Sequence, residues 1–130
     1  MIDYLDMIGT PYEEGAVDFE RGRLDCKGVV VEVYRRAGLS LPKDAFYRSS
    51  GVWHEVSLEG CREYDLIVSD PGREGCSSHV SVVVRGGAHG DALTAERKRG
   101  VCLVRIALIR NVVGVYRFNE LDRARDRVVP

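Results

Sequence analysis

Long apolar runs are missing from this sequence. No segment of the 130 residues approaches the roughly 18 consecutive apolar residues of a transmembrane helix. The first ten residues, MIDYLDMIGT, contain acids where a secretory signal has its apolar core. We therefore expect no membrane insertion and a protein that is cytoplasmic as synthesised.

An excess of charge of one sign is missing as well. Nineteen basic and 20 acidic residues are mixed along the chain and leave a formal net charge of −1, so we expect no nucleic-acid partner. The four cysteines form no C-x-x-C pair and no regular metal-ligand spacing, and we expect neither metal nor cofactor. Three of them we interpret as ordinary packing or exposed residues: Cys61, Cys76 and Cys102.

Hydrophobic residues make up 45% of the sequence, which is enough for one small core but not for two, and no linker divides the chain. We expect a single domain over residues 1–130. Helical patterns come first and strand patterns follow, which favours an α+β fold with N-terminal helices packed on a mainly antiparallel sheet. The predicted helices cover 1–8 and 25–37, and the predicted strands cover 64–70, 79–85, 91–95, 100–108 and 112–118.

Cys26 stands at the predicted start of the helix over 25–37. Asp25 has the short acceptor side chain of an N-cap, and apolar residues follow it at helical spacing. The unpaired N–H groups and the positive end of the helix dipole favour a thiolate there, which is the nucleophilic form of cysteine. The alternative is a small buried hydrophobe, and helix context alone does not decide between the two.

A nucleophilic cysteine needs a base within hydrogen-bond reach, and the sequence offers three histidines. His54 lies in a segment without clear periodicity, and His89 lies in a glycine-rich, loop-like segment. His79 opens the run HVSVVV, which has strand composition, so it would project from a rigid strand end. His79 is our predicted base, and a polar residue that simply begins a strand is the alternative.

The imidazole of such a base is commonly held by a third polar group. The Gly-Gly dipeptide at 86–87 is typical of a two-residue hairpin turn, and counting outward from it places His79 opposite Thr94. Thr94 is therefore the predicted third member. A bulge or a longer loop would bring Asp91 or His89 nearer instead.

Several short motifs follow one another in a fixed order along the chain. They are Gly9-Thr10-Pro11-Tyr12, Asp25-Cys26-x-Gly28, Gly38-x-x-Leu41-Pro42, Asp65-Leu66, Ser78-His79-Val80 and Gly100-Val101. In this order and spacing they resemble the NlpC-type family of papain-like cysteine peptidases, the bacterial and phage cell-wall endopeptidases. The spacer before Cys26 and the ending VVGVYRF look most similar to the phage tail-assembly branch of that family.

The resemblance implies a papain-like thiol hydrolase that cuts an amide bond in the stem peptide of peptidoglycan, often between D-glutamate and the diamino acid. Cys26 would attack, and His79 would act as base and then as acid. The residues expected to contact substrate are Tyr12, Asp25 and Lys27. The implied partners are the peptidoglycan peptide and a phage tail or secretion apparatus that carries the protein to the wall.

Three positions depart from the family pattern. Lys27 stands where the family usually has Ser, and this cation would favour the thiolate but change the pocket for the peptide's amino end. Thr94 stands where His, Asn or Gln is usual, and Tyr64 replaces a common Gly, which we interpret as a surface change.

Two other functions stay open: a catalytically weak or silent binding or assembly module, and an intracellular thiol amidase or isopeptidase with a non-wall substrate.

Overall fold

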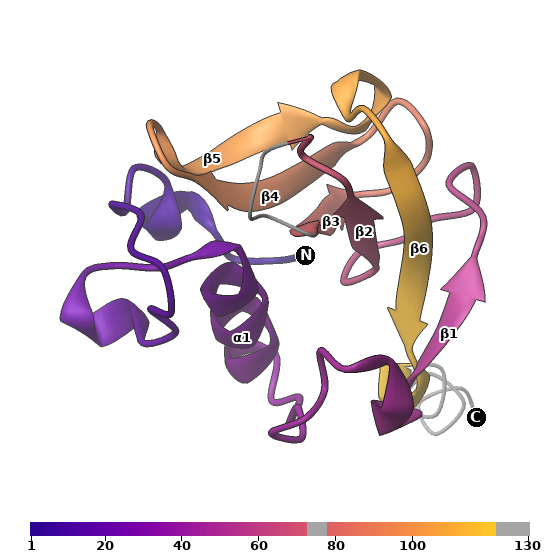
Figure 1. The fold of residues 1–130 in the computed structure, drawn as a ribbon, viewed down its shortest axis with the longest axis horizontal. Coiled ribbons are helices and arrows are strands. Elements are labelled where there is room, and N and C mark those ends of the chain that lie inside the picture. The colour runs from indigo at the N-terminus through magenta and orange to yellow at the C-terminus, as the bar shows by residue number, and fades with distance from the viewer. Residues whose placement is uncertain (73–77, 122–130) are drawn as a thin grey trace.

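The computed structural model describes residues 1–72 and 78–121, and Cys76 lies outside these ranges. Within them the regular structure consists of one α-helix, six strands and four short 3-10 helices (Figure 1). In chain order they are η1 (Leu5–Met7), η2 (Phe19–Arg21), α1 (Cys26–Arg36), η3 (Arg48–Ser50), β1 (Trp53–Val56), β2 (Leu66–Ser69), β3 (His79–Arg85), β4 (Asp91–Glu96), β5 (Gly100–Arg105), η4 (Ile106–Leu108) and β6 (Val112–Phe118).

Helix α1 begins at Cys26 because Asp25 caps it. The Asp25 carboxylate accepts a hydrogen bond from the Gly28 N–H at 2.7 Å, which satisfies one of the donors that a helix start leaves open. The buried apolar face of the helix consists of Val29, Val30, Val33 and Tyr34. The predicted helix over 25–37 is confirmed, whereas the one over 1–8 contains only η1. No helix in the described part of the chain has the length and apolar character of a membrane span.

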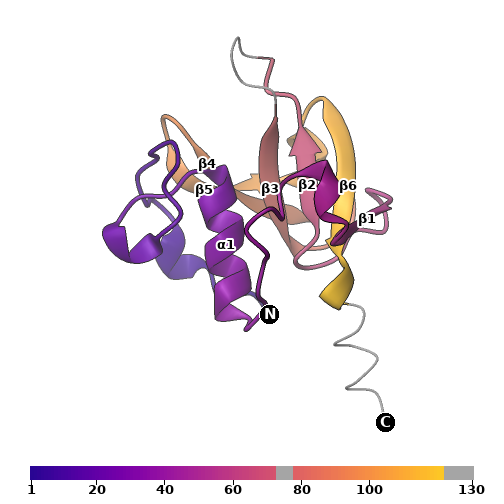
Figure 2. The same ribbon diagram turned by 60° about the horizontal axis from the view of Figure 1, so that its bottom comes forward.

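The six strands form one antiparallel sheet in the order β1-β6-β2-β3-β4-β5. Helix α1 packs against β3 and β4, as Figure 2 shows. The larger core lies between them and includes Val82, Leu93 and Tyr34. Ile67 and Val83, each next to a residue of that core along its strand, point to a smaller cluster on the other face. This architecture confirms the predicted α+β class.

Two stretches differ from the sequence prediction. The edge strand β1, which pairs with β6, was not predicted, because it is only four residues long and its two central side chains are exposed. The predicted strand over 100–108 ends early, because its last three residues form η4. There the Ile106 N–H donates to the Gly90 carbonyl at 3.0 Å instead of continuing the strand.

The predicted two-residue turn at 86–87 is wrong. Five residues connect β3 to β4, because Arg85 pairs with Asp91, and a β-bulge lies in β3 next to this pair. The loop closes so tightly that a Cβ at Gly90 would lie 1.8 Å from the Arg85 carbonyl oxygen. Only glycine fits there, and the Gly-Gly dipeptide therefore marks a longer glycine-rich loop.

A buried ion pair ties β6 to the segment before β2. Asp65 is 0% exposed, and its carboxylate accepts two hydrogen bonds from the Arg117 guanidinium at 2.9 and 2.8 Å. It accepts a third from the Arg62 N–H at 2.8 Å. A carboxylate that has left water needs such partners, so this pair fixes how the strand and the segment meet.

Tyr64 is not a surface substitution, contrary to the interpretation drawn from the sequence. Its side chain is half-buried, and its ring packs edge-on against that of Tyr34 at 5.8 Å between centroids. Its backbone has a φ of +76°, in the region where glycine is the usual residue. In that conformation the Tyr64 carbonyl accepts a hydrogen bond from the Tyr34 hydroxyl at 2.5 Å.

We expect Asp65→Asn to lower the free energy of unfolding by about 3 kcal/mol, because it leaves the Arg117 charge without its bidentate partner. Urea denaturation followed by circular dichroism measures this. The control is Arg99→Gln, which removes an ion pair to Glu96 whose arginine side chain is 59% exposed, and it should cost less than about 1 kcal/mol. Equal midpoints for the two variants would contradict a stabilising role for the buried pair.

Candidate active site

A cleft of about 830 Å³ opens beside the N-terminus of α1. One side is formed by α1 and the segment 39–46 that follows it, and the rest by residues 12–17, the start of β3 and the turn between β4 and β5. The cleft is lined by five of the six predicted site residues: Tyr12, Asp25, Cys26, Lys27 and His79. The sixth, Thr94, is 1% exposed and reaches the site through His79.

The backbone before α1 places Cys26 in the cleft. The Leu24 N–H donates to the Pro11 carbonyl at 3.0 Å, and the Asp25 N–H donates to the Ala16 carbonyl at 2.9 Å. The Ala16 carbonyl lies so close to the first turn of α1 that a Cβ at Gly28 would sit 2.2 Å from it. The glycine of the Asp-Cys-x-Gly motif is therefore needed for this approach, which holds the Tyr12 segment beside the cysteine.

The Asp25 carboxylate is engaged in holding the same structure. Besides the Gly28 N–H, it accepts the Gly15 N–H at 2.8 Å, and the residue is only 9% exposed. One side chain thus joins the loop at residue 15 to the start of the helix. The contact of Asp25 with substrate stays a prediction, and its capping role is a feature of the structure.

His79 and Thr94 are hydrogen-bonded, with 2.8 Å between His79 Nε2 and Thr94 Oγ1. The same hydroxyl lies 2.8 Å from the Val80 carbonyl, which can only accept. The hydroxyl proton is therefore donated to Val80, and Thr94 Oγ1 accepts from His79 Nε2–H. This pattern assigns the neutral imidazole the Nε2-protonated tautomer and leaves Nδ1 as the basic nitrogen.

Cys26 is half-buried, and burial raises the pKa of its thiol. A hydrogen bond from the Val80 N–H and the charge of Lys27 act in the opposite direction, while the Asp25 charge adds to the rise in pKa. Desolvation thus acts against the thiolate that the helix start is expected to favour, and the reactivity of Cys26 stays a prediction. The contact with Val80 places the Cys26 sulfur next to the residue that follows His79.

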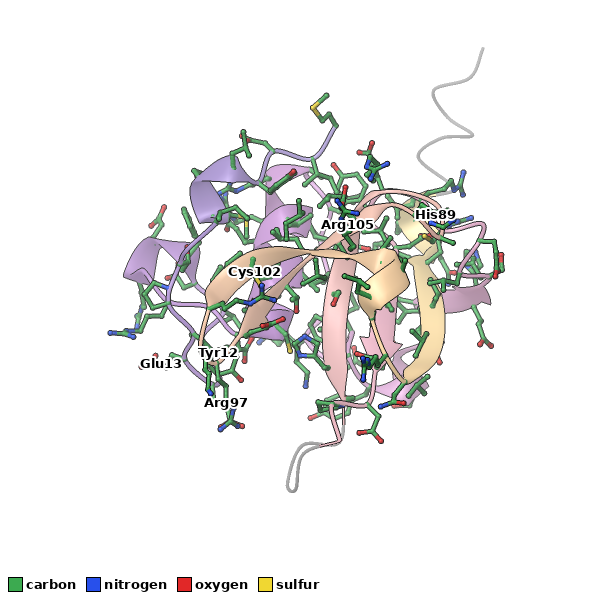
Figure 3. All side chains as sticks on the ribbon, turned by 90° about the horizontal axis from the view of Figure 1, so that it is seen from above. Tyr12, Glu13, His89, Arg97, Cys102 and Arg105 are labelled. Atoms are coloured by element: carbon green, nitrogen blue, oxygen red, sulfur yellow. The ribbon has the colours of Figure 1, made fainter. Side chains whose placement is uncertain are left out.

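The two alternative third residues lie elsewhere. Asp91 is paired with Arg85 at 2.8 Å, at the end of the β3–β4 hairpin away from His79. The His89 carbonyl accepts from Arg85 in the same loop, and Figure 3 shows His89 at the opposite end of the molecule from Tyr12. Neither residue can hold the imidazole of His79 in this structure.

Tyr12 lies at the edge of the cleft beside Arg97, which the sequence reasoning missed (Figure 3). The guanidinium carbon is 6.0 Å from the centre of the Tyr12 ring, within cation–π range. Burial raises the pKa of Tyr12, and the neighbouring charges of Cys26 and Asp25 add to this, so the hydroxyl stays a proton donor. The run of three basic residues at 97–99 is the sequence signal that could have drawn attention to Arg97.

Metal chemistry has no evident ligand set among residues 1–72 and 78–121, where no three His, Cys, Asp or Glu side chains gather into a cluster that could hold an ion.

Fold and site together define a papain-like protein with a cysteine and a histidine in one cleft. The family model described as NlpC/P60 family matches residues 9–116, and the chain therefore belongs to the NlpC/P60 family. This family is generally one of cysteine peptidases. No curated protein matches the chain.

Three solved structures resemble the chain in fold. A protein similar to a lipoprotein of the NLP/P60 family from Staphylococcus aureus aligns with a TM-score of 0.65 and 24% identity, over 88% of this chain and 38% of its own. An NlpC/P60 family protein from Bacillus cereus aligns with a TM-score of 0.65 and 22% identity, over 86% of this chain and 36% of its own. The NlpC/p60 domain of the peptidoglycan hydrolase SagA aligns with a TM-score of 0.59 and 22% identity, over 87% of this chain and 91% of that domain. This chain thus spans little more than a third of the first two proteins.

Thr94→Val should allow His79 to adopt both neutral tautomers, because valine keeps the shape of threonine and removes the acceptor for Nε2–H. We expect ¹⁵N chemical shifts of the His79 ring to report the Nε2-protonated form in the wild type and in Thr94→Ser, and a mixture of tautomers in Thr94→Val. Asp91→Asn is the control and should leave the shifts unchanged. An unaltered tautomer in Thr94→Val would show that the hydroxyl does not position the ring.

Lys27→Met should raise the pKa of Cys26 further, because it removes a charge that lowers it. Alkylation by iodoacetamide requires the thiolate, so at any given pH the variant should react more slowly, and its rate profile should move to higher pH. Peptide mass spectrometry across a pH series measures this, with Cys61 and Cys102 as internal references. Lys98→Met, in the β4–β5 turn, is the matched control, and an equal displacement in both variants would refute a local effect of Lys27.

Proposed function

We propose that the chain is a cysteine endopeptidase that hydrolyses an amide bond in the stem peptide of peptidoglycan, between D-glutamate and the diamino acid. The observation that carries this proposal is the meeting of Cys26, at the start of α1, with the His79–Thr94 pair in one open cleft. Membership of the NlpC/P60 family supports the reaction class. The fold shared with a domain of a peptidoglycan hydrolase supports the substrate class.

In the first half of the reaction the Cys26 sulfur attacks the amide carbonyl, and the thiol proton moves to His79 Nδ1. A tetrahedral oxyanion forms. The carbon–nitrogen bond then breaks as the imidazolium returns the proton to the leaving amine, which leaves a thioester on Cys26. In the second half, water attacks the thioester and gives its proton to His79. The thiolate leaves and is reprotonated, and the new carboxylic acid departs.

Two hydrogen-bond donors near the Cys26 sulfur are suited to stabilise the oxyanion. The Cys26 N–H is the first of the helix and has no acceptor within it, and the Tyr12 hydroxyl is kept protonated by its raised pKa. Donors of this type, already oriented before the reaction, typically lower the barrier by about 3 kcal/mol each. Both donors are held in place by the backbone hydrogen bonds that join residues 11–16 to the start of α1.

Burial raises the pKa of Cys26, which suits a mechanism in which His79 acts as a general base and takes the thiol proton during attack. A neutral hydroxyl as the third group fits this role, because it orients the ring without adding a negative charge beside the imidazolium.

The second candidate function is a catalytically weak or silent binding module. It is favoured by the same raised thiol pKa and by the hydroxyl at the third position, where a carboxylate would stabilise the imidazolium more strongly. For both functions we propose a phage or prophage tail as the carrier to the cell wall, supported by the likeness of the spacer before Cys26 and of the β6 sequence to the tail-assembly branch.

Cys26→Ala should lower the rate of hydrolysis of a stem tripeptide, L-Ala-γ-D-Glu with a diamino acid, by at least about 10³-fold, because it removes the sulfur that forms the thioester. Mass spectrometry of the released diamino acid measures the rate. Cys102→Ala, on β5, is the control and should retain activity, and circular dichroism should show both variants folded. Hydrolysis that persists in Cys26→Ala would exclude Cys26 as the nucleophile, and a wild type that binds the tripeptide without cutting it would establish the binding module.

A further inference from the structure

The charged side chains that line the cleft differ from one side to the other. On the side of Tyr12, Glu14 and Arg97 have opposite signs. On the side formed by α1 and the segment 39–46, Lys27 and Lys43 line the cleft, and neither has an ion-pair partner among the described residues. The cleft therefore has one side with mixed charge and one side that is cationic.

Two other charged side chains near the cationic side are already hydrogen-bonded within the protein. Arg35 also lines the cleft, but its guanidinium makes two hydrogen bonds of 2.8 Å to the buried carboxylate of Glu32. The Asp25 carboxylate is bound by the Gly15 and Gly28 N–H groups. The charges of the two lysines are thus left for a ligand.

The surroundings of the two lysines are apolar. Lys27 Nζ lies 5.8 Å from the centre of the Phe46 ring, and Val31, one turn along α1 from Lys27, lines the cleft together with Leu41. These apolar neighbours suit the methylene groups of a ligand that bears the anion.

We propose that Lys27 and Lys43 recognise a free carboxylate next to the scissile amide, so that the cleft selects acidic peptides over their amidated counterparts. This inference rests on the proposed function and specifies its substrate. In a stem peptide the group is the α-carboxylate of the γ-linked D-glutamate, and the competing peptide has a carboxamide of the same shape at that position. The preference should weaken as salt is added, because the two lysine side chains are exposed.

The test separates binding from cleavage by using Cys26→Ala, which keeps the cleft and lacks the nucleophile. Isothermal titration calorimetry at 50 mM NaCl compares L-Ala-γ-D-Glu-L-Lys with the same peptide carrying D-isoglutamine. We expect the acidic peptide to bind at least about fivefold more tightly, and Lys43→Gln in the same background to reduce the ratio towards one. Lys98→Gln removes the same charge from the β4–β5 turn outside the cleft and should leave the ratio unchanged.

Each outcome bears on this inference separately from the proposed function. A ratio that does not exceed one in Cys26→Ala, including the absence of binding, overturns carboxylate recognition whether or not the wild type cleaves. A clear ratio that Lys43→Gln leaves intact overturns the assignment of the carboxylate to Lys27 and Lys43 together. A clear ratio that disappears in Lys43→Gln, combined with a wild type that cuts neither peptide, supports the recognition site and removes the hydrolase.

Discussion

The structure depends on one carboxylate at the start of helix α1. Asp25 accepts the Gly28 N–H inside the helix and the Gly15 N–H outside it, while its own N–H binds the Ala16 carbonyl. Three polar contacts of one residue thus fix the first turn of α1 against the chain that precedes it. Without them the helix could still pack its apolar face on β3 and β4, but the direction in which Cys26 leaves the first turn would no longer be defined.

The sheet contributes the side chains of His79 and Thr94 to the site, together with one backbone position, Val80. Val80 N–H is directed at the Cys26 sulfur, and Val80 C=O accepts the hydroxyl proton of Thr94. The two peptide groups that flank the Val80 Cα therefore set the position of the sulfur and the tautomer of His79. Because Val80 is itself buried in the core, the packing of α1 on β3 holds the start of the helix next to the start of the strand.

Local sequence was sufficient to predict α1 and the strands β2 to β6, but not the register in which β3 and β4 pair. The cap at Asp25 and the strand start at His79 could be predicted, because each depends on neighbours in the sequence. Thr94 was reached by counting from a two-residue turn that does not exist. The pairing of Val82 with Leu93 places Thr94 diagonal to His79 and not opposite it, so the hydroxyl is reached by the length of the imidazole side chain.

The cleft could not be predicted in the same way, because Lys43 and Arg97 come from a loop and a turn whose positions follow from tertiary packing. A third cation of the cleft, Lys27, also acts on the pKa of the Cys26 thiol. Desolvation raises the pKa of Cys26, and a nearby cation lowers it, so the first acts against the thiolate and Lys27 acts in its favour. A bound carboxylate close to Lys27 would offset that cation and raise the thiol pKa further. In the proposed mechanism the transfer of the thiol proton to His79 would then depend on the orientation that Thr94 gives the ring.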